Sequence, residues 1–323
     1  MSLLSRKLIV IAGKGGVGRT TTAIALALAA ARQGLYTAVL ELNGASGVPE
    51  LWGFSGRDYA PRSLAPNVDT ISMSALDTLD DFGIRRLKLD ALVRVLFHNR
   101  VMDAFLDAVP GLHDLIQLGK VNSLLHENYP QDPKYDLIVL DAPATGHGLT
   151  LLGAARNMAD MTRVGPFYEE ARRIEAILAD PEHTALVIVT LPEELPVNET
   201  LQLAGALGPD QDLLCAVVVN KVLPNPLPPG VAWPRMREVL AASDHPAVPP
   251  LLSLADRTAE RHRDQYHAFR RLSEELPHVI GREVPIGRLH RVPHVPTRND
   301  LAQLGEQLDA ILTRASPDTE EVA

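Results

Sequence analysis

A cluster of glycines near the start of the chain has the spacing of a phosphate site. Residues 8–12 form a short apolar run rich in β-branched side chains, and an alanine-rich segment follows the glycines and extends to residue 32. The glycines are Gly13, Gly15, Gly16 and Gly18. Glycine permits positive φ and close approach to backbone N–H groups, and a helix that begins here directs its positive dipole end at the same point. The order strand, loop, helix therefore predicts an anion site, and we expect the anion to be a phosphate.

The loop follows the Walker A pattern with one departure. Gly13 is followed after four residues by Gly18 and, two positions later, by Thr20, but the lysine expected at position 19 is Arg19. The residues expected to contact phosphates are Gly13, Gly15, Gly16, Val17, Gly18, Arg19, Thr20 and Thr21. Arg19 can reach β- and γ-phosphate oxygens, although a guanidinium does not replace an ammonium group neutrally. We expect Arg19 to affect the rate of turnover more than the binding of the ligand. The alternative is a loop that only turns a strand into a helix.

An acidic residue follows a second buried strand pattern. Residues 135–140, YDLIVL, are typical of a strand buried on both faces, and Asp141 comes directly after them. Open α/β sheets bind ligands at the carboxyl ends of their strands. We therefore expect Asp141 to lie near Mg²⁺, directly or through water, and Gly146 to give a mobile switch loop. The alternative is that Asp141 caps a helix that begins near residue 147.

The rest of the pattern indicates an α/β fold. Further strands are expected at 37–42, 68–73, 185–190, 214–220 and 279–285, and helices at 21–32, about 197–207, 234–242, 255–276 and 300–314. Proline-rich segments at 223–230 and 245–250 predict loops. Strands separated by helices predict a doubly wound, mostly parallel sheet. We expect a single domain over residues 1–314 and a disordered acidic tail at 315–323.

A helical insertion is expected at about residues 75–128. Apolar side chains recur there at helical spacing, first around Leu92 and Leu96, then around Val101 and Phe105, and again over residues 112–125. Two interpretations are open. The stripes can pack over the sheet, or they can form an apolar groove for a protein client. The chain contains six methionines, which is few for an adaptable binding surface.

Composition excludes several classes of function. The 31 basic and 40 acidic residues give a net charge of -9, which argues against a nucleic-acid partner and gives no basic stripe for an anionic membrane. Cys215 is the only cysteine, so one chain cannot form a disulfide, a Cys-x-x-Cys zinc clip or a multi-thiol metalloid site. The longest apolar run, residues 23–31, is too short to span a bilayer, and no signal peptide is recognised. We expect a cytoplasmic protein without an intrinsic membrane segment.

Two segments resemble a known family. Residues 12–20, AGKGGVGRT, resemble the deviant Walker A loop of SIMIBI-class P-loop ATPases, which has an additional lysine, here Lys14. Residues 141–152, DAPATGHGLTLL, resemble switch II of the arsenite-pump ATPases and of the related ATPases that target tail-anchored membrane proteins. Residues 110–125, the segment PEELPVNET at 192–200, and Asn220 after a strand also lie where that family has similar segments. The resemblance extends over the length of a single-domain member.

The resemblance implies a dimer that closes around two molecules of ATP or ADP with Mg²⁺. Lys14 would reach the phosphates bound by the partner, and the partner would be a second copy or a paralogous ATPase. Thr20 would ligate Mg²⁺, Asn220 would hydrogen-bond adenine, and the loop containing Pro293, Val295 and Pro296 would lie on the adenine side. From the residues alone, Lys14 adds positive charge where β- and γ-oxygens gain negative charge, or it is a solvated surface lysine.

The switch I segment departs from the family pattern. The family has an aspartate there, in a segment like TDPAH, that orients the attacking water, and Asn43 stands in its place. An amide cannot accept a proton as a carboxylate does, so hydrolysis could fall by about 10²- to 10⁴-fold. Glu41, two residues earlier on the same strand face, could compensate, although impaired turnover is the outcome we favour. Arg19 and Asn43 therefore both affect catalysis rather than the shape of the pocket.

These observations leave three classes of function. The first is an ATPase whose switch II relays loss of the γ-phosphate to client helices at 89–125. The second is a hydrolysis-impaired nucleotide-binding regulatory subunit paired with an active paralogue. The third, a positioning ATPase on a membrane or on DNA, predicts a basic amphipathic C-terminal helix, whereas the C-terminus is acidic. The single cysteine also argues against a metalloid pump, a nitrogenase-type iron–sulfur protein and a zinc-clipped targeting factor.

Overall fold

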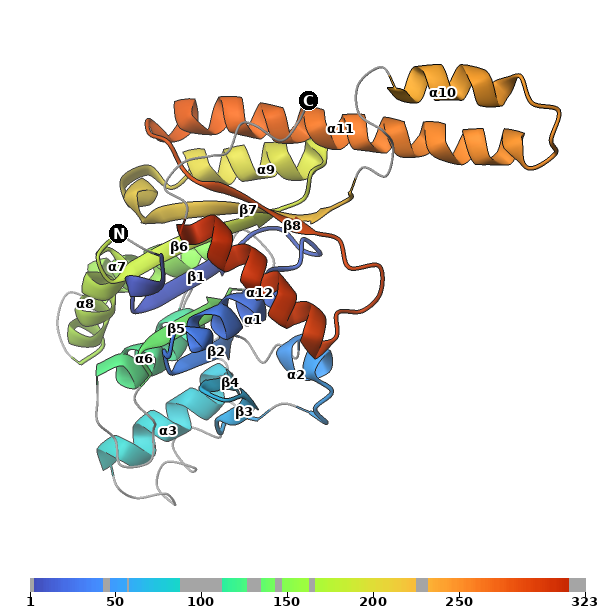
Figure 1. The fold of residues 1–323 in the computed structure, drawn as a ribbon. Coiled ribbons are helices and arrows are strands. Elements are labelled where there is room, and N and C mark those ends of the chain that lie inside the picture. Colours follow the sequence, from blue (N-terminus) through green and yellow to red (C-terminus); the bar gives the residue numbers. More distant parts are fainter. Residues whose placement is uncertain are drawn as a thin grey trace.

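Eight strands form one sheet in the computed structural model (Figure 1). The structure describes residues 3–42, 47–56, 58–87, 112–126, 135–142, 147–162, 166–224 and 232–313. The strands are β1 Leu8–Ala12, β2 Thr37–Glu41, β3 Arg62–Ala65, β4 Val68–Ser72, β5 Leu137–Asp141, β6 Thr184–Thr190, β7 Leu214–Val222 and β8 Ile286–His290. Their order is β3-β4-β2-β5-β1-β6-β7-β8, and every neighbouring pair is parallel except β3 with β4. The predicted mostly parallel sheet is confirmed.

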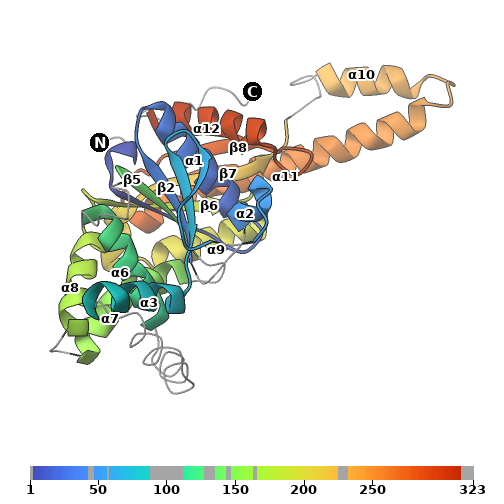
Figure 2. The same cartoon turned by 90° about the horizontal axis from the view of Figure 1, so that it is seen from below.

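Helices cover both faces of this sheet (Figures 1 and 2). They are α1 Arg19–Arg32, α2 Gly47–Trp52, α3 Ala75–Leu87, α6 Leu112–His126, α7 His147–Thr162, α8 Pro166–Leu178, α9 Glu194–Gly205, α10 Ala232–Ala241, α11 Val248–Ile280 and α12 Arg298–Thr313. Short 3₁₀ helices lie at Leu3–Ser5 and Gly208–Leu213. Because the carboxyl ends of the parallel strands share one edge, the loops that follow β1, β2, β5 and β7 meet there.

Alternate residues of β1 belong to two separate cores. Leu8 and Val10 pack with α6, α7, α8, α9 and α11, whereas Ile9 and Ile11 pack with α1 and α12. Successive side chains of a strand point to opposite faces, so a strand covered on both sides is apolar throughout. All five residues of β1 and of β5 are buried. This arrangement explains why these strands were recognisable as continuous apolar runs.

Helix α12 lies directly on α1, the helix that begins at the glycine loop. A Cβ atom at Gly305 would lie 2.6 Å from the carbonyl oxygen of Ala25, so only glycine allows this approach of the two backbones. Arg32 Nη1 on α1 also lies 2.6 Å from Glu306 Oε1 on α12. The C-terminal helix therefore fixes the position of α1 and, with it, one side of the loop.

The helical insertion packs over the sheet where it is described. Leu112, Leu115, Leu118, Val121 and Leu124 of α6 are all buried in the core that includes β1 and β5. The packing interpretation therefore applies to the stripe over residues 112–125. The stripes around residues 89–109 lie outside the described residues, and a client groove there stays a prediction.

The largest errors of the sequence-based assignment concern the C-terminal third. The strand expected at 279–285 is wrong, because α11 continues to Ile280 and the last strand is β8. The apolar stripe Ala268, Leu272, Leu276 and Ile280 is buried and has helical spacing, and Gly281, with φ +75°, ends the helix. Pro277 lies in the last turn of α11; it lacks the N–H that would donate to Ser273 O, and only three helical residues follow it.

Two further segments differ from expectation. The proline-rich segment 245–250 is not entirely a loop, because α11 begins at Val248 with prolines in its first turn, where they are tolerated. Strand β3 was not predicted, since its sequence RSLA has little strand character. Helices α2 and α8 were not predicted either, and the boundaries of the other elements shift by a few residues, as is usual for helix and strand ends.

Helices α10 and α11 form a hairpin that projects from the body of the molecule (Figures 1 and 2). Arg237 of α10 holds Asp256 of α11 through two hydrogen bonds of 2.8 and 2.9 Å. Only the C-terminal part of α11 contributes buried residues, beginning at Ala268. None of the helices in the described ranges is long and apolar enough to cross a membrane.

Candidate functional site

The glycine loop, residues 13–18, turns the chain from β1 into α1, and at two of its glycines a Cβ would collide with a neighbouring atom. Gly13 has φ +147°, and a Cβ there would lie 2.3 Å from the carbonyl oxygen of Val189. Gly18 has φ +94°, and a Cβ there would lie 2.2 Å from Asn220 Nδ2. Positive φ and close backbone approach are what glycine alone permits. The loop therefore has the conformation that its glycines predicted.

Strand β7 supports this loop from behind. Asn220 Nδ2 donates to Val17 O at 2.8 Å, and Asn220 Oδ1 accepts a hydrogen bond from the N–H of Lys221 at 2.8 Å. Lys221 has φ +59°, and its Nζ donates to Gly16 O at 2.8 Å. Sequence reasoning missed Lys221, although a lysine directly after Asn220 at a strand end was a usable signal. In this structure the Asn220 amide contacts the loop backbone. Its predicted contact with adenine stays a prediction.

A pocket of about 380 Å³ opens in front of the loop. It is lined by Gly16, Gly18, Arg19, Thr20, Thr21, Gly47, Glu50, Leu51 and Val295. Val295, from the predicted adenine-side loop, therefore lies at the same pocket as the glycines. Pro293 and Pro296 are not among the lining residues. Glu50 and Leu51 come from α2, which sequence reasoning did not connect to the site.

Thr20 and Asp141 meet at the edge of this pocket. The Thr20 hydroxyl donates to Asp141 Oδ2 at 2.5 Å. Asp141 is the last residue of β5 and is buried, and its Oδ1 has no hydrogen-bond partner among the described residues. Burial raises the pKa of Asp141, while the hydrogen bond from Thr20 and the charge of Arg19 oppose the rise. The side chain is thus directed at the loop.

A second buried carboxylate lies beside Asp141. Glu41 of β2 is its register partner across the β2–β5 pair. Glu41 Oε1 accepts a hydrogen bond from Val48 N at 2.8 Å, and Oε2 accepts one from Ser72 Oγ at 3.0 Å. Its exposed fraction is 0%. Burial raises the pKa of Glu41 to about 7, with a smaller contribution from the charge of Asp141. Glu41 therefore connects α2 to the sheet and is titratable near neutral pH.

The two basic residues at the glycine loop and the start of α1 differ in position. Arg19 lines the pocket, and its Nη1 donates to the carbonyl oxygen of Ala142. Burial lowers the pKa of Arg19, and the nearby charge of Asp141 partly offsets this effect. Lys14 lies on the outer side of the loop with a side chain that is 54% exposed, and its Nζ lies 3.2 Å from Glu199 Oε1 on α9. Arg19 thus faces inward and Lys14 outward.

Some predicted features cannot be placed. Asn43 and residues 143–146 of the predicted switch II loop lie outside the described residues. The described ranges contain no group of three or more His, Cys, Asp or Glu side chains arranged to hold a metal ion. Cys215 is a free thiol, half-buried on β7, and burial raises its pKa.

Known proteins are similar to the part of the chain that contains this site. Residues 6–166 and 155–229 match the sequence model of a family described as Anion-transporting ATPase. ATPase BagA of Mycobacterium tuberculosis (strain ATCC 25618 / H37Rv) is 28% identical over 236 residues, covering 69% of this chain and 67% of BagA.

Two more distant relatives carry names that point to the same group. A putative arsenical pump-driving ATPase 2 of Aquifex aeolicus (strain VF5) is 26% identical over 242 residues, which cover 66% of this chain and 79% of that protein. An ATPase ASNA1 homolog 2 of Paramecium tetraurelia is 23% identical over 256 residues, which cover 68% of this chain and 77% of that protein. The family match includes the glycine loop, Asp141 and Asn220.

Proposed function

Because the chain belongs to the anion-transporting ATPase family, we propose that it binds ATP with Mg²⁺ at the glycine loop and hydrolyses it, acting as a dimeric clamp. The fold is that of a P-loop NTPase of the SIMIBI class. The proposal depends on the conformation of the loop. Gly13 and Gly18 adopt positive φ there, and Asn220 donates a hydrogen bond to the loop backbone. No other segment of the described chain combines positive-φ glycines with a helix N-terminus at the carboxyl edge of the sheet.

The phosphates would be held by the backbone of the loop and by α1. The first N–H groups of a helix have no partner within the helix, and its dipole favours negative charge at that end. Arg19 and Thr20 are the first residues of α1, and both line the pocket. Arg19 can turn from the carbonyl of Ala142 toward a phosphate oxygen. Its guanidinium would then exchange a neutral hydrogen-bond acceptor for a charged one.

Thr20 and Asp141 fit the requirements of Mg²⁺. Their side chains provide a hydroxyl and a carboxylate, oxygen donors that this ion prefers, and Asp141 Oδ1 is buried without a hydrogen-bond partner in the described ranges. When bound, Mg²⁺ supplies positive charge against the charge that develops on the β- and γ-phosphate oxygens. Thr20 and Asp141 are already in contact, so little rearrangement of the chain is needed.

Lys14 is proposed to act on the nucleotide of a partner chain. Its ion pair with Glu199 is more than half exposed on the lysine side, and such pairs contribute only about 0–1 kcal/mol. Lys14 can therefore leave Glu199 and contact the phosphates bound by a second subunit with little loss of stability. This supports a clamp in which each subunit contributes a charge that its own pocket does not use.

Helix α7 connects the pocket to the helical insertion. It begins at His147, a few residues after Asp141, and packs against both α6 and α8. A change in the segment after Asp141 on loss of the γ-phosphate would therefore reach α6 through α7. This contact supports coupling of nucleotide state to an apolar client or partner bound at the insertion.

A hydrolysis-impaired regulatory subunit, paired with an active paralogue, is the second candidate. The environment of Glu41 favours it, because both carboxylate oxygens already accept hydrogen bonds and the side chain is fully buried. Glu41 is therefore not positioned to accept a proton from water in the pocket. The residue in the place of the family's switch I acid, Asn43, cannot do so either.

Phosphate release and native mass, measured with and without ATP and Mg²⁺, test both candidates. An ATPase should release phosphate above background and double its mass when ATP is added, and Asn43→Asp should raise release by roughly 10²- to 10⁴-fold. A rate equal to that of Arg19→Ala contradicts the enzyme proposal. Nucleotide-dependent mass without release supports the regulatory subunit.

The two ends of β5 offer a matched control. Asp141→Asn should abolish Mg²⁺-dependent release because it removes a carboxylate at the pocket. Asp136→Asn alters an exposed aspartate just before the same strand, where its carboxylate accepts a hydrogen bond from Tyr36 N. It should leave release unchanged. Equal loss in both variants would indicate damage to β5 rather than to a site.

A further inference from the structure

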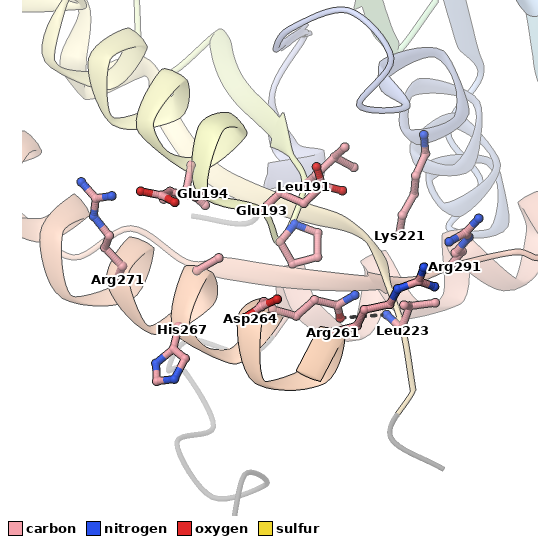
Figure 3. Close-up of a pocket in the computed structure, with 14 residues that line it drawn as sticks. Leu191, Glu193, Glu194, Lys221, Leu223, Arg261, Asp264, His267, Arg271 and Arg291 are labelled. Carbon is pink, nitrogen blue, oxygen red and sulfur yellow. Dashed lines mark hydrogen bonds between the residues drawn. The ribbon is translucent and has the colours of Figure 1, made fainter. Parts of the chain in front are cut away.

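A second and larger pocket lies on the other side of Lys221. It has a volume of about 1000 Å³ and is bounded by α9, the middle of α11 and the chain that follows β6, β7 and β8 (Figure 3). It shares no lining residue with the pocket in front of the glycine loop. Leu191, Val197 and Ala268 are among the residues that form the apolar part of its wall. Nothing in the proposed ATPase function uses this pocket.

Arg261 of α11 and Arg291, which follows β8, lie at one end of this pocket (Figure 3). Neither forms an ion pair or a side-chain hydrogen bond with any described residue. Other arginines of α11 do, since Arg270 holds Glu274 and Arg271 holds Glu275 at 2.7 Å each. The carboxylates that also line the pocket are Glu193, Glu194 and Asp264, and none is within ion-pair distance of Arg261 or Arg291.

Lys221 adds a third cationic group to this end of the pocket. Its ammonium donates one hydrogen bond, to Gly16 O, so two of its three N–H donors have no partner among the described residues. An anion bound at this end of the pocket would be stabilised by the two guanidinium groups that lack an ion-pair partner in the described ranges, and by the spare N–H donors of Lys221 beside them. The three come from different segments, so no local sequence feature requires their proximity.

We propose that this pocket binds a free phosphomonoester with an apolar body, as a second ligand distinct from the nucleotide at the glycine loop. The two phosphate charges would balance Arg261 and Arg291, whose planar groups match phosphate oxygens. The apolar body would lie on the wall of Leu191, Val197 and Ala268. The volume is at the upper end of the range for small-molecule sites.

The site is connected to the glycine loop through one hydrogen bond. A phosphate that draws Lys221 Nζ away from Gly16 O removes a support of the loop. Occupancy of the second pocket should therefore change the affinity of the first for nucleotide, and by reciprocity nucleotide should change the affinity of the second.

Titration with phenyl phosphate and inorganic phosphate, followed by NMR, tests the proposal. The protein is first saturated with a non-hydrolysable ATP analogue and Mg²⁺, so that the glycine loop does not take up the probe. Phenyl phosphate should bind one site per chain, about 10-fold more tightly than inorganic phosphate because its ring covers the apolar wall. Arg261→Gln and Arg291→Gln should each weaken binding by at least about 10-fold.

Arg263→Gln is the matched control, since Arg263 is an exposed arginine of α11 that does not line the pocket. It should leave binding unchanged. Equal weakening by Arg263→Gln, no effect of Arg261→Gln, or binding only to vesicles that contain a phosphoinositide would overturn the proposal. The outcome is independent of the ATPase, because a chain that binds no nucleotide can still bind phenyl phosphate through Arg261.

Discussion

The two pockets at the carboxyl edge of the sheet are built in different ways. The smaller one is built around two glycines of the loop with positive φ, Gly16 and Gly18, and the start of α1, with further residues from α2 and Val295. The larger one is made of side chains from α9, α11 and the ends of three strands. Lys221 stands between them, lining one and hydrogen-bonded to the loop of the other.

The two pockets should differ in how they respond to single substitutions. A site made of backbone conformations is disrupted when a glycine whose Cβ would meet main-chain atoms, such as Gly13, is replaced. A site made of exposed side chains can lose one group and keep its shape, so the loss appears in ligand affinity and not in stability. Variants of the two pockets should therefore separate stability from binding.

The largest effect is expected for Gly13→Ala. Its Cβ would lie 2.3 Å from a backbone oxygen at a φ of +147°, so the unfolding free energy should fall by more than about 3 kcal/mol. Gly16→Ala is the control, because Gly16 has φ +82° with no atom within 4 Å and should lose only about 1 kcal/mol. Urea unfolding measures both. Similar losses would contradict the description of the loop as sterically fixed.

A smaller loss is expected for Asn220→Ala, which removes a side-chain support and not a backbone conformation. Two hydrogen bonds of a buried amide disappear and leave Val17 O and Lys221 N without their partner, which costs about 2–3 kcal/mol. Nucleotide affinity should fall as well. Unfolding and nucleotide titration of the same variant measure the two effects. Unchanged affinity would mean that the loop holds its conformation without β7.

The buried acid Glu41 should make stability depend on pH. Its pKa is about 7 in the folded chain, above the ordinary 4.5, so the folded state binds more protons between these values. The unfolding free energy should therefore fall as pH rises from about 4.5 to 7, by roughly 3 kcal/mol, and this fall should be absent in Glu41→Gln. Urea unfolding across this range compares the two proteins. Parallel curves would show that Glu41 does not titrate there.

The smallest effect is expected for the exposed pair of Lys14 and Glu199. Lys14→Met and Glu199→Gln should each change stability by less than about 1 kcal/mol, with a coupling in the double variant of similar size. The two variants should differ in nucleotide-dependent dimerisation. Lys14→Met removes the positive charge proposed to contact the partner's phosphates, whereas Glu199→Gln keeps Lys14 and removes only its ion-pair partner. Equal dimerisation of the two variants would remove the proposed role of Lys14.

Much of the backbone site was predictable. The strand at residues 8–12, the glycine spacing and the acid at the end of the next buried strand each depend on a few neighbouring residues. Lys221 and Glu41 show the limit of such reasoning. Lys221 matters because β7 lies behind the loop, and Glu41 is inaccessible because α2 and Ser72 cover it.

The sequence by itself determined the glycine loop and the parallel strands, because backbone freedom and strand periodicity are local properties. Only the tertiary structure decided that α11 continues to Ile280, that Thr20 contacts Asp141, and that Arg261 and Arg291 share a second pocket. Those features depend on packing between segments far apart in the chain. Spacing along a sequence does not encode such distances.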